Sequence, residues 1–261
     1  MNWLASRVTL RVRTLPEILD LGLVFLVENW KPIARLGLAI LVVPFAVCVV
    51  LQFRHTPWWE IWIVAVVLGS TAEGAFTAAA GQLLFNDRLG LRQMLAPFAR
   101  RLLPFLMTRL NAAIALAAVS PVILPLPAVS ARTLFFNEYC LLEAASPFQC
   151  FRRGGQLTRR QTARAALFVV LLLGANFAFA AFADALGHSV VEFVFQLGRP
   201  VGSLFRDGGS TFALAGYFLS IPYVASARFL AYVDSRTRME GWDIQVRFAS
   251  LQQRAASQEA A

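Results

Sequence analysis

Residues 58–84 read WWEIWIVAVVLGSTAEGAFTAAAGQLL, and this stretch decides the fold. Glu60 and Glu73 are the only charged residues in it. A helix rises about 1.5 Å per residue, so a run of this length can cross the roughly 30 Å of hydrocarbon in a lipid bilayer. The stretch therefore predicts a transmembrane helix.

The rest of the chain contains further apolar runs of similar length. Transmembrane helices are also expected over residues 33–52, 102–125, 163–183 and 210–232. Hydrophobic residues make up 58% of the chain and charged residues 15%, whereas an average soluble domain is roughly 45–50% apolar and about 25% charged. These features predict an all-α, polytopic membrane protein and argue against a soluble enzyme.

Residues 127–145, PAVSARTLFFNEYCLLEAA, are apolar enough to be helical but carry charges, among them Arg132 and Glu138. Charge placement decides whether this segment crosses, because short cytoplasmic loops are enriched in Lys and Arg. Three parts of the chain are rich in Lys and Arg. The first contains Arg7, Arg11, Arg13 and Lys31, the second Arg88, Arg92, Arg100 and Arg101, and the third Arg152, Arg153, Arg159, Arg160 and Arg164. All three can be cytoplasmic only if the chain crosses an even number of times between Arg101 and Arg152. We therefore expect a sixth helix at 127–145, three hairpins, and both termini in the cytoplasm.

A short amphipathic stretch precedes each hairpin, at about residues 16–30, 89–101 and 147–158. Such stretches bury one face at the headgroup boundary and lie in the membrane interface. We expect them to form elbow helices within a single membrane domain of residues 1–245. Residues 246–261 are expected to form a flexible cytoplasmic tail.

Three stretches together resemble a known family: the Pro-Leu-Pro break at 125–127, the run CFRRGGQLT at 150–158, and the tail YVDSRTRMEGWD at 232–243. They are similar to a bacterial six-helix inner-membrane family related to the membrane domain of glycerophosphodiester phosphodiesterases and to YciC-like proteins. The resemblance implies a six-helix fold in the inner membrane and a neighbourhood that includes MoxR-type ATPase systems. It does not imply phosphodiesterase activity, because in that family the chemistry belongs to a separate soluble barrel.

Polar side chains inside predicted spans are costly and point to a function or to a pairing partner. The candidates are Glu73, Arg109, Asn111, Arg132 and Glu138. A Glu73–Arg109 or Glu73–Arg132 pair would neutralise the charges and join hairpins. The alternative is a wet path for an ion or a small or lipidic solute, using Glu73, Arg109 and Glu138.

Charged residues also mark the end of the last predicted helix: Asp234, Arg236, Arg238, Glu240 and Asp243. Asp234 and Arg238, like Arg236 and Glu240, are four residues apart, so each couple shares one helix face. These residues predict either a solvated helix end or a cytoplasmic docking site for a partner.

Catalytic and metal-binding patterns are missing from the sequence. His55 and His188 are isolated, and Cys48, Cys140 and Cys150 form no C-x-x-C motif. The net charge of +9 fits cytoplasmic loops, and no nucleic-acid reader motif accompanies it. The sequence thus favours a non-enzymatic scaffold subunit without a cofactor, with membrane lipids and other membrane proteins or further copies of itself as partners.

Overall fold

The computed structural model describes residues 13–84, 86, 89–121, 125–159, 161–196 and 202–240, and every regular element among them is helical. The elements are α1 (Leu15–Glu28), α2 (Trp30–Phe53), α3 (Trp58–Leu83), α4 (Leu91–Arg100), α5 (Leu102–Val119), α6 (Leu126–Thr133), α7 (Phe136–Leu141), α8 (Pro147–Thr158), α9 (Thr162–Ser189), a π-helical turn (Val190–Val194), α10 (Leu204–Asp207) and α11 (Thr211–Glu240).

Five of these helices are long and apolar enough to cross a membrane: α2, α3, α5, α9 with its π-helical turn, and α11 up to Arg238. They cover the expected spans at 33–52, 58–84, 102–125, 163–183 and 210–232, although α5 already ends at Val119. The protein is therefore all-helical in its described part, with the composition of a multi-pass membrane protein. Helices α1, α4 and α8 occupy the three segments expected to be elbows.

The sixth span expected at 127–145 is not present as one helix. The segment instead forms α6 and the six-residue α7, with a non-helical turn at Leu134 and Phe135 between them. Every residue of α7 is buried, including Asn137 and Glu138. Because buried polar groups need protein partners rather than lipid, the chain bends inward here and does not continue as a straight helix. Neither piece alone is long enough to span a bilayer.

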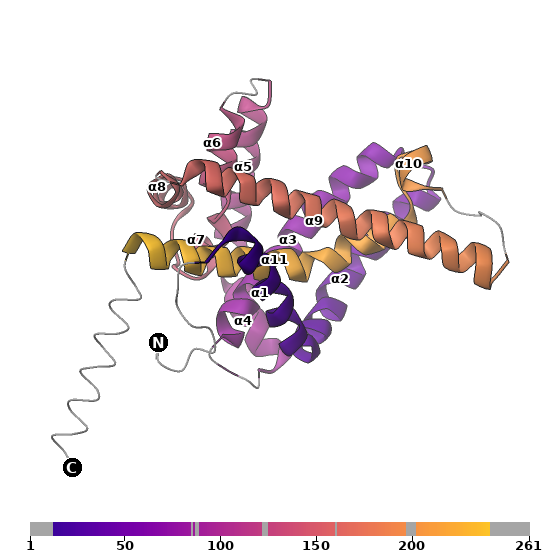
Figure 1. Ribbon diagram of the computed structural model, residues 1–261, viewed down its shortest axis with the longest axis horizontal. Helices are drawn as coiled ribbons and strands as arrows, with labels where there is room; N and C mark the ends of the chain where they lie inside the picture. Colours follow the sequence, from indigo (N-terminus) through magenta and orange to yellow (C-terminus); the bar gives the residue numbers. More distant parts are fainter. Residues whose placement is uncertain are drawn as a thin grey trace, which may run out of the picture.

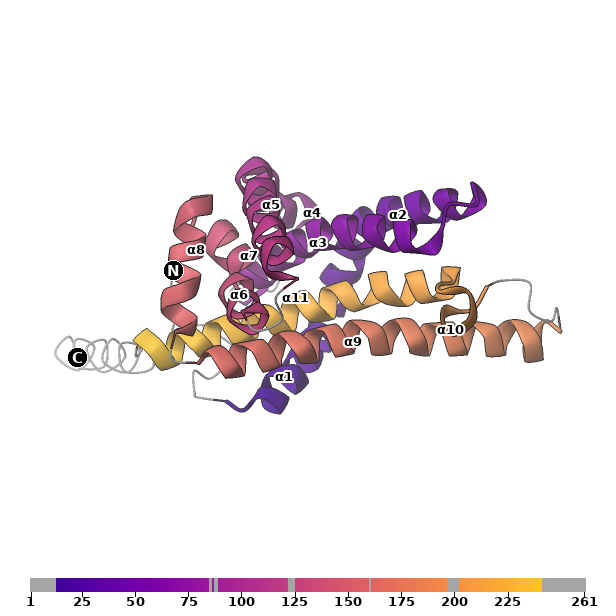
Figure 2. The same ribbon diagram turned by 90° about the horizontal axis from the view of Figure 1, so that it is seen from above.

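The helices are arranged as pairs that spread from a common region around α7 (Figure 1). Helix α2 packs along α3, α5 along α6, and α9 along α11. The turned view shows α9 and α11 side by side over most of their lengths (Figure 2). Helix α11 also contacts α1, α2 and α3. Within the apolar 18-residue stretch of each helix, 78% of the residues are buried in α11, against 11% in α2. Helix α11 is therefore the core of the molecule, and α2 is a peripheral helix.

Small residues allow α11 to lie close to its neighbours. The Cβ atom of an alanine at Gly22 of α1 would lie 3.1 Å from Ala227 Cβ of α11. A Cβ atom at Gly216 of α11 would overlap the Phe179 carbonyl oxygen and come within 2.6 Å of Ala183 Cβ, both on α9. Glycine at these two positions thus sets the separation of the helices, as small residues do in membrane proteins.

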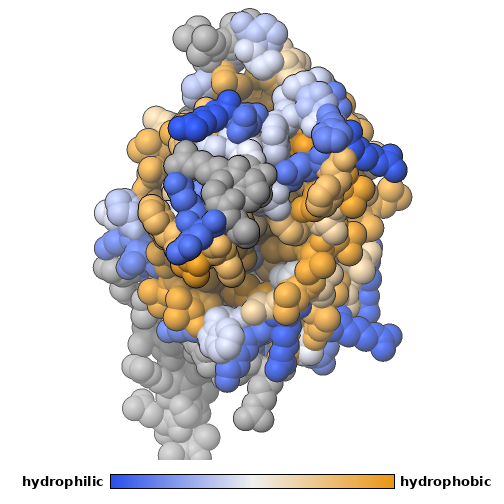
Figure 3. All heavy atoms as spheres, turned by 90° about the vertical axis from the view of Figure 1, so that its right-hand side faces the viewer, coloured by the Kyte–Doolittle hydropathy of each residue, from blue (hydrophilic) through white to orange (hydrophobic). Residues whose placement is uncertain are grey.

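Hydrogen bonds join distant segments at two places in the molecule. At one end, Trp62 Nε1 donates to the Gly208 carbonyl at 2.8 Å, and Thr211 Oγ1 donates to Gln52 Oε1 at 2.7 Å. The other place lies in the common region around α7, where Arg101 Nη1 donates to the Cys140 carbonyl at 3.3 Å. The chain therefore leaves through α5 and returns through α6 and α7 to the place where it started. Figure 3 looks toward the end of the molecule that holds the first of these contacts and shows broad apolar areas with hydrophilic side chains in patches between and around them.

Candidate functional site

Four charged side chains, three of them buried and one partly exposed, meet where α3, α5, α7 and α11 converge. They are Glu73, Arg109, Glu138 and Arg228, one from each helix in that order, and are called here the central ion cluster. Two carboxylates face two guanidinium groups, so the cluster carries no net charge.

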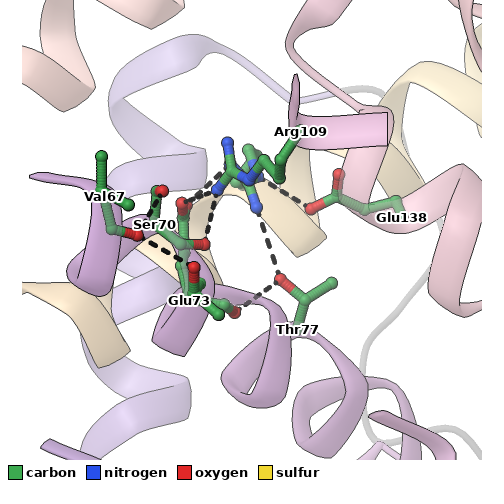
Figure 4. Close-up of polar contacts among 8 residues, drawn as sticks. Val67, Ser70, Glu73, Thr77, Arg109 and Glu138 are labelled. Atoms are coloured by element: carbon green, nitrogen blue, oxygen red, sulfur yellow. Dashed lines mark hydrogen bonds and ion pairs between the residues drawn. The ribbon is translucent and has the colours of Figure 1, made fainter. Parts of the chain in front are cut away.

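Glu73 and Arg109 form the first pair of this cluster. Arg109 Nη2 lies 2.6 Å from Glu73 Oε2 and also donates to the Ser70 carbonyl at 2.9 Å. The Arg109 guanidinium lies over the ring of Phe105, 5.7 Å from its centroid. Figure 4 shows how the Glu73, Arg109 and Glu138 side chains point toward a shared centre. Of the two pairings expected from the sequence, the structure contains Glu73–Arg109.

Arg228 connects this pair to Glu138. Its Nη1 lies 2.7 Å from Glu73 Oε1, and its Nε donates to Glu138 Oε1 at 2.9 Å. Its Nη2 lies 3.5 Å from the hydroxyl of Thr77, which itself donates to the Glu73 carbonyl at 3.1 Å. Arg228 is thus the central residue of the cluster, because it contacts both carboxylates.

The cluster is largely shielded from its surroundings. Side-chain exposure is 0% for Glu138, 7% for Arg228, 12% for Glu73 and 26% for Arg109. A charge in such surroundings is tolerated only with a close counter-charge and further hydrogen bonds. Four buried polar atoms in and beside the cluster form no aligned hydrogen bond among the described residues: Glu73 Oε1, Arg109 Nε, Asn137 Nδ2 and Glu138 Oε2. Glu73 Oε1 still has its close ion pair with Arg228.

The other two residues predicted for this site lie elsewhere. Arg132 is exposed on α6 and takes no part in the cluster, so the alternative Glu73–Arg132 pair is not formed. Asn111 is exposed on α5. Sequence reasoning does not single out Arg228, although it is the only charged residue in the predicted span 210–232. That isolation was the signal that could have found it.

A second network, called here the C-terminal ion cluster, ties the end of α11 to α9 and to the residues before α1. Asp234 Oδ2 lies 3.0 Å from Arg164 Nη2 and 2.8 Å from Arg238 Nε, while Asp234 Oδ1 accepts from the Arg13 amide at 2.8 Å. Arg164 Nη2 also donates to the Arg13 carbonyl at 2.7 Å. The Asp234 side chain is only 2% exposed.

A neighbouring group of contacts joins α11 to α8 and to the residues after α7. Glu143 pairs with Arg153 at 2.5 Å and with Arg236, and it accepts a hydrogen bond from the Tyr232 hydroxyl. The Arg236 guanidinium lies over the rings of Tyr139 and Tyr232, at 5.6 and 5.5 Å from their centroids.

The sequence left open a solvated helix end or a docking site for a partner at the end of the last helix, and the structure places its described charged residues in contacts within the chain. Asp234 is buried, and Arg236 and Arg238 are 14% and 22% exposed and bonded within the chain. The predicted site extends to Glu240 and Asp243, but the side chain of Glu240, all of Asp243 and the tail at 246–261 lie outside the described residues. The three described residues anchor α11.

Metal-binding arrangements are missing from the described part of the chain, where no group of three or more His, Cys, Asp or Glu side chains is suitably placed. No family model, no curated protein and no solved structure matches the chain. The resemblance to the six-helix inner-membrane family therefore stays a prediction.

Proposed function

We propose that the chain is a non-enzymatic, multi-pass subunit of the bacterial inner membrane that acts as a structural component of a membrane protein complex. The charges within its helices neutralise one another in the central ion cluster and leave no isolated reactive group there. A different polar residue carries the proposal: Asn111 of α5 is exposed and has no hydrogen-bond partner among the described residues.

An exposed amide on a transmembrane helix is costly in lipid, and such groups commonly hydrogen-bond across helix interfaces. Beside Asn111, large apolar side chains form a stripe along α5 with exposures of 40% or more, at Leu103, Met107, Leu110 and Ile114. Their spacing of four, three and four residues matches the seam of two packed helices. The proposed partner of α5 is therefore a transmembrane helix of another protein or of a second copy. The MoxR-type ATPase neighbourhood implied by the resemblance is a source of candidates for the wider complex.

Site-specific photo-cross-linking in the native host tests this proposal. A photoreactive amino acid at Leu110 should capture one partner in high yield, identified by mass spectrometry. The same residue placed at Leu173, an equally lipid-facing position of α9 with 63% exposure, should not. Asn111→Leu should weaken capture from Leu110. A chain that stays monomeric and uncross-linked at Leu110 in its native membrane contradicts the proposal.

The proposed orientation has both termini in the cytoplasm. It requires six passages through the membrane, and the broken segment α6–α7 makes the fourth of them, between α5 and α9. The hydrogen bond between Arg101 and the Cys140 carbonyl supports it, since the chain returns to the start of α5 before the next basic segment. Reporter fusions at Thr56 and Gly208 should read outside, and a fusion at Gly155 should read inside. An outside signal at Gly155 rules this orientation out.

A transporter or channel is the second candidate, favoured by the buried polar atoms without aligned partners around Glu73 and Glu138. Such atoms are commonly satisfied by water, and water is what a polar path needs. Proton or ion flux is measured into liposomes that contain the purified wild type or the Glu73→Gln variant. This comparison decides between a structural subunit and a transporter or channel. Flux that is absent, or unaffected by the substitution, removes this candidate.

A further inference from the structure

An apolar groove of about 590 Å³ lies between α1, α2 and α11. Its lining includes Trp30, Leu41 and Phe45 of α2 and Phe218 and Pro222 of α11. This volume is within the roughly 300–1,000 Å³ typical of ligand sites. The rings of Phe45 and Phe218 meet edge to face at 6.2 Å and form part of the wall.

The position of the groove indicates what kind of molecule fills it. Both α2 and α11 are candidate membrane spans, and only 11% of the residues in the apolar 18-residue stretch of α2 are buried within the protein. From Trp30 to Phe45 the groove follows α2 for about 22 Å at 1.5 Å per residue. Its surroundings in a membrane are hydrocarbon, so a lipid chain lying along α2 matches its shape and polarity.

One end of the groove carries positive charge. Lys31 and Arg35 are exposed on α2 and directly follow the lining residues Trp30 and Ala34, and Lys31 Nζ lies 5.8 Å from the centroid of the Trp30 ring. Neither cation pairs with a carboxylate among the described residues, unlike Arg164, Arg228 and Arg238. Beyond Arg35, α2 has no charged residue up to Phe53.

This polarity, cationic at one end and apolar along the rest, matches a lipid with a negative headgroup. We propose that the groove binds one anionic phospholipid, with an acyl chain along α2 between Trp30 and Phe45 and the phosphate at Lys31 and Arg35. Basic pockets between helices at the cytoplasmic side of membranes bind anionic headgroups in this way. The inference does not depend on the structural role proposed above.

Lipid titration of the full chain in detergent tests the headgroup half of this proposal. Phosphatidylglycerol and phosphatidylcholine with identical acyl chains are added, and bound lipid is counted by native mass spectrometry together with the rise in melting temperature. Wild type should prefer phosphatidylglycerol. Lys31→Gln with Arg35→Gln should weaken binding of that lipid about 30-fold, which is about 2 kcal/mol at roughly 1 kcal/mol per basic residue.

The matched control removes two exposed arginines, one in α8 and one directly after it, with Arg152→Gln and Arg159→Gln, and should leave lipid preference unchanged. Ala34→Phe tests the acyl-chain half, because Ala34 lines the groove and is exposed, so the new ring enters the groove without disturbing the core. This variant should keep the lipid-free melting temperature and lose binding of both lipids.

Three outcomes overturn the proposal. Equal binding of the two lipids by wild type shows no headgroup recognition. An equal loss in the α8 control shows diffuse attraction instead of a site. If light scattering finds a wild-type dimer that Ala34→Phe converts to a monomer, the groove holds a second copy of the chain.

Discussion

The central and C-terminal ion clusters both depend on α11, but they differ in charge balance and in access to water. In the central cluster two carboxylates match two arginines, and Glu138 and Arg228 are at most 7% exposed. In the C-terminal cluster Asp234 faces both Arg164 and Arg238, which are 24% and 22% exposed. Water can solvate the surplus cation at the end of α11, whereas the core tolerates only a neutral set of charges. The two clusters should therefore respond very differently to the loss of one charge.

The largest effect is expected from Arg228→Met. The substitution leaves Glu138 buried without its ion pair and deprives Glu73 of one of its two cations. Breaking a buried pair by removing one partner typically costs about 3–5 kcal/mol. Thermal unfolding of the purified protein in detergent should show a large drop in melting temperature.

A double variant sharpens this prediction. Arg228→Met with Glu138→Met removes one cation and one anion together and leaves the Glu73–Arg109 pair neutral. Because replacing a buried pair by apolar residues is often close to neutral, most of the lost stability should return. If the double variant melts as low as the single one, charge balance is not what the core requires.

Packing of α11 against α9, away from both clusters, should have the next largest effect. Gly216→Ala places a methyl group onto the Phe179 carbonyl and Ala183, which backbone geometry cannot accommodate without separating the helices. Overpacking of this kind costs about 1–3 kcal/mol. Gly174→Ala on α9 is the control, since its new methyl group meets nothing within 4 Å, and helix propensity makes it neutral or slightly stabilising.

Asp234→Asn should cost less, on the order of 1 kcal/mol, because Arg164 and Arg238 are partly exposed and can be solvated when the charge is lost. The asparagine can still accept from the Arg13 amide. Hydrogen exchange at Arg13 and the start of α1 should rise, together with a small fall in melting temperature. A loss as large as that of Arg228→Met would erase the distinction between the two clusters.

The smallest effect on stability is expected from Cys150, a buried residue of α8. Burial, reinforced by Cys140, raises the pKa of the Cys150 thiol from 9.0 to about 11. Between about pH 9 and 11 the Cys150 thiol is therefore still protonated in the folded state but loses its proton in the unfolded chain. The contribution of this group to the free energy of unfolding should be constant below pH 9 and should fall as pH rises from about 9 to 11. Cys150→Ser should flatten this part of the stability profile, while thiol reagents at neutral pH should label Cys150 only after unfolding.

The spans were predictable because their signal is local: a run of apolar residues reveals a membrane helix without knowledge of its neighbours. The same local signal marked Glu73 and Arg109 as charges within apolar runs, but it left open whether Glu73 pairs with Arg109 or Arg132 or lines a wet path. The structure contains the pair with Arg109. The break at Leu134 and Phe135 could not be predicted, because it depends on how α7 meets the other helices.

Residues near the end of α11 teach a related lesson. The four-residue spacing of Asp234 and Arg238 correctly places them on one helix face, and the pair is present at 2.8 Å. Spacing does not reveal what lies opposite that face. Here it is Arg164 of α9 and the backbone of Arg13, from parts of the chain far away in sequence.

The contact between α1 and α11 has a consequence for biosynthesis. Gly22 fits against Ala227, and the amide of Arg13 bonds to Asp234, 221 residues later in the chain. At about 5–20 residues per second, roughly 10 to 45 s pass between the synthesis of these two residues. During that time Gly22 of α1 lacks the α11 residue against which it packs. The contact between α1 and α11 can therefore form only after the four other candidate membrane spans have been synthesised.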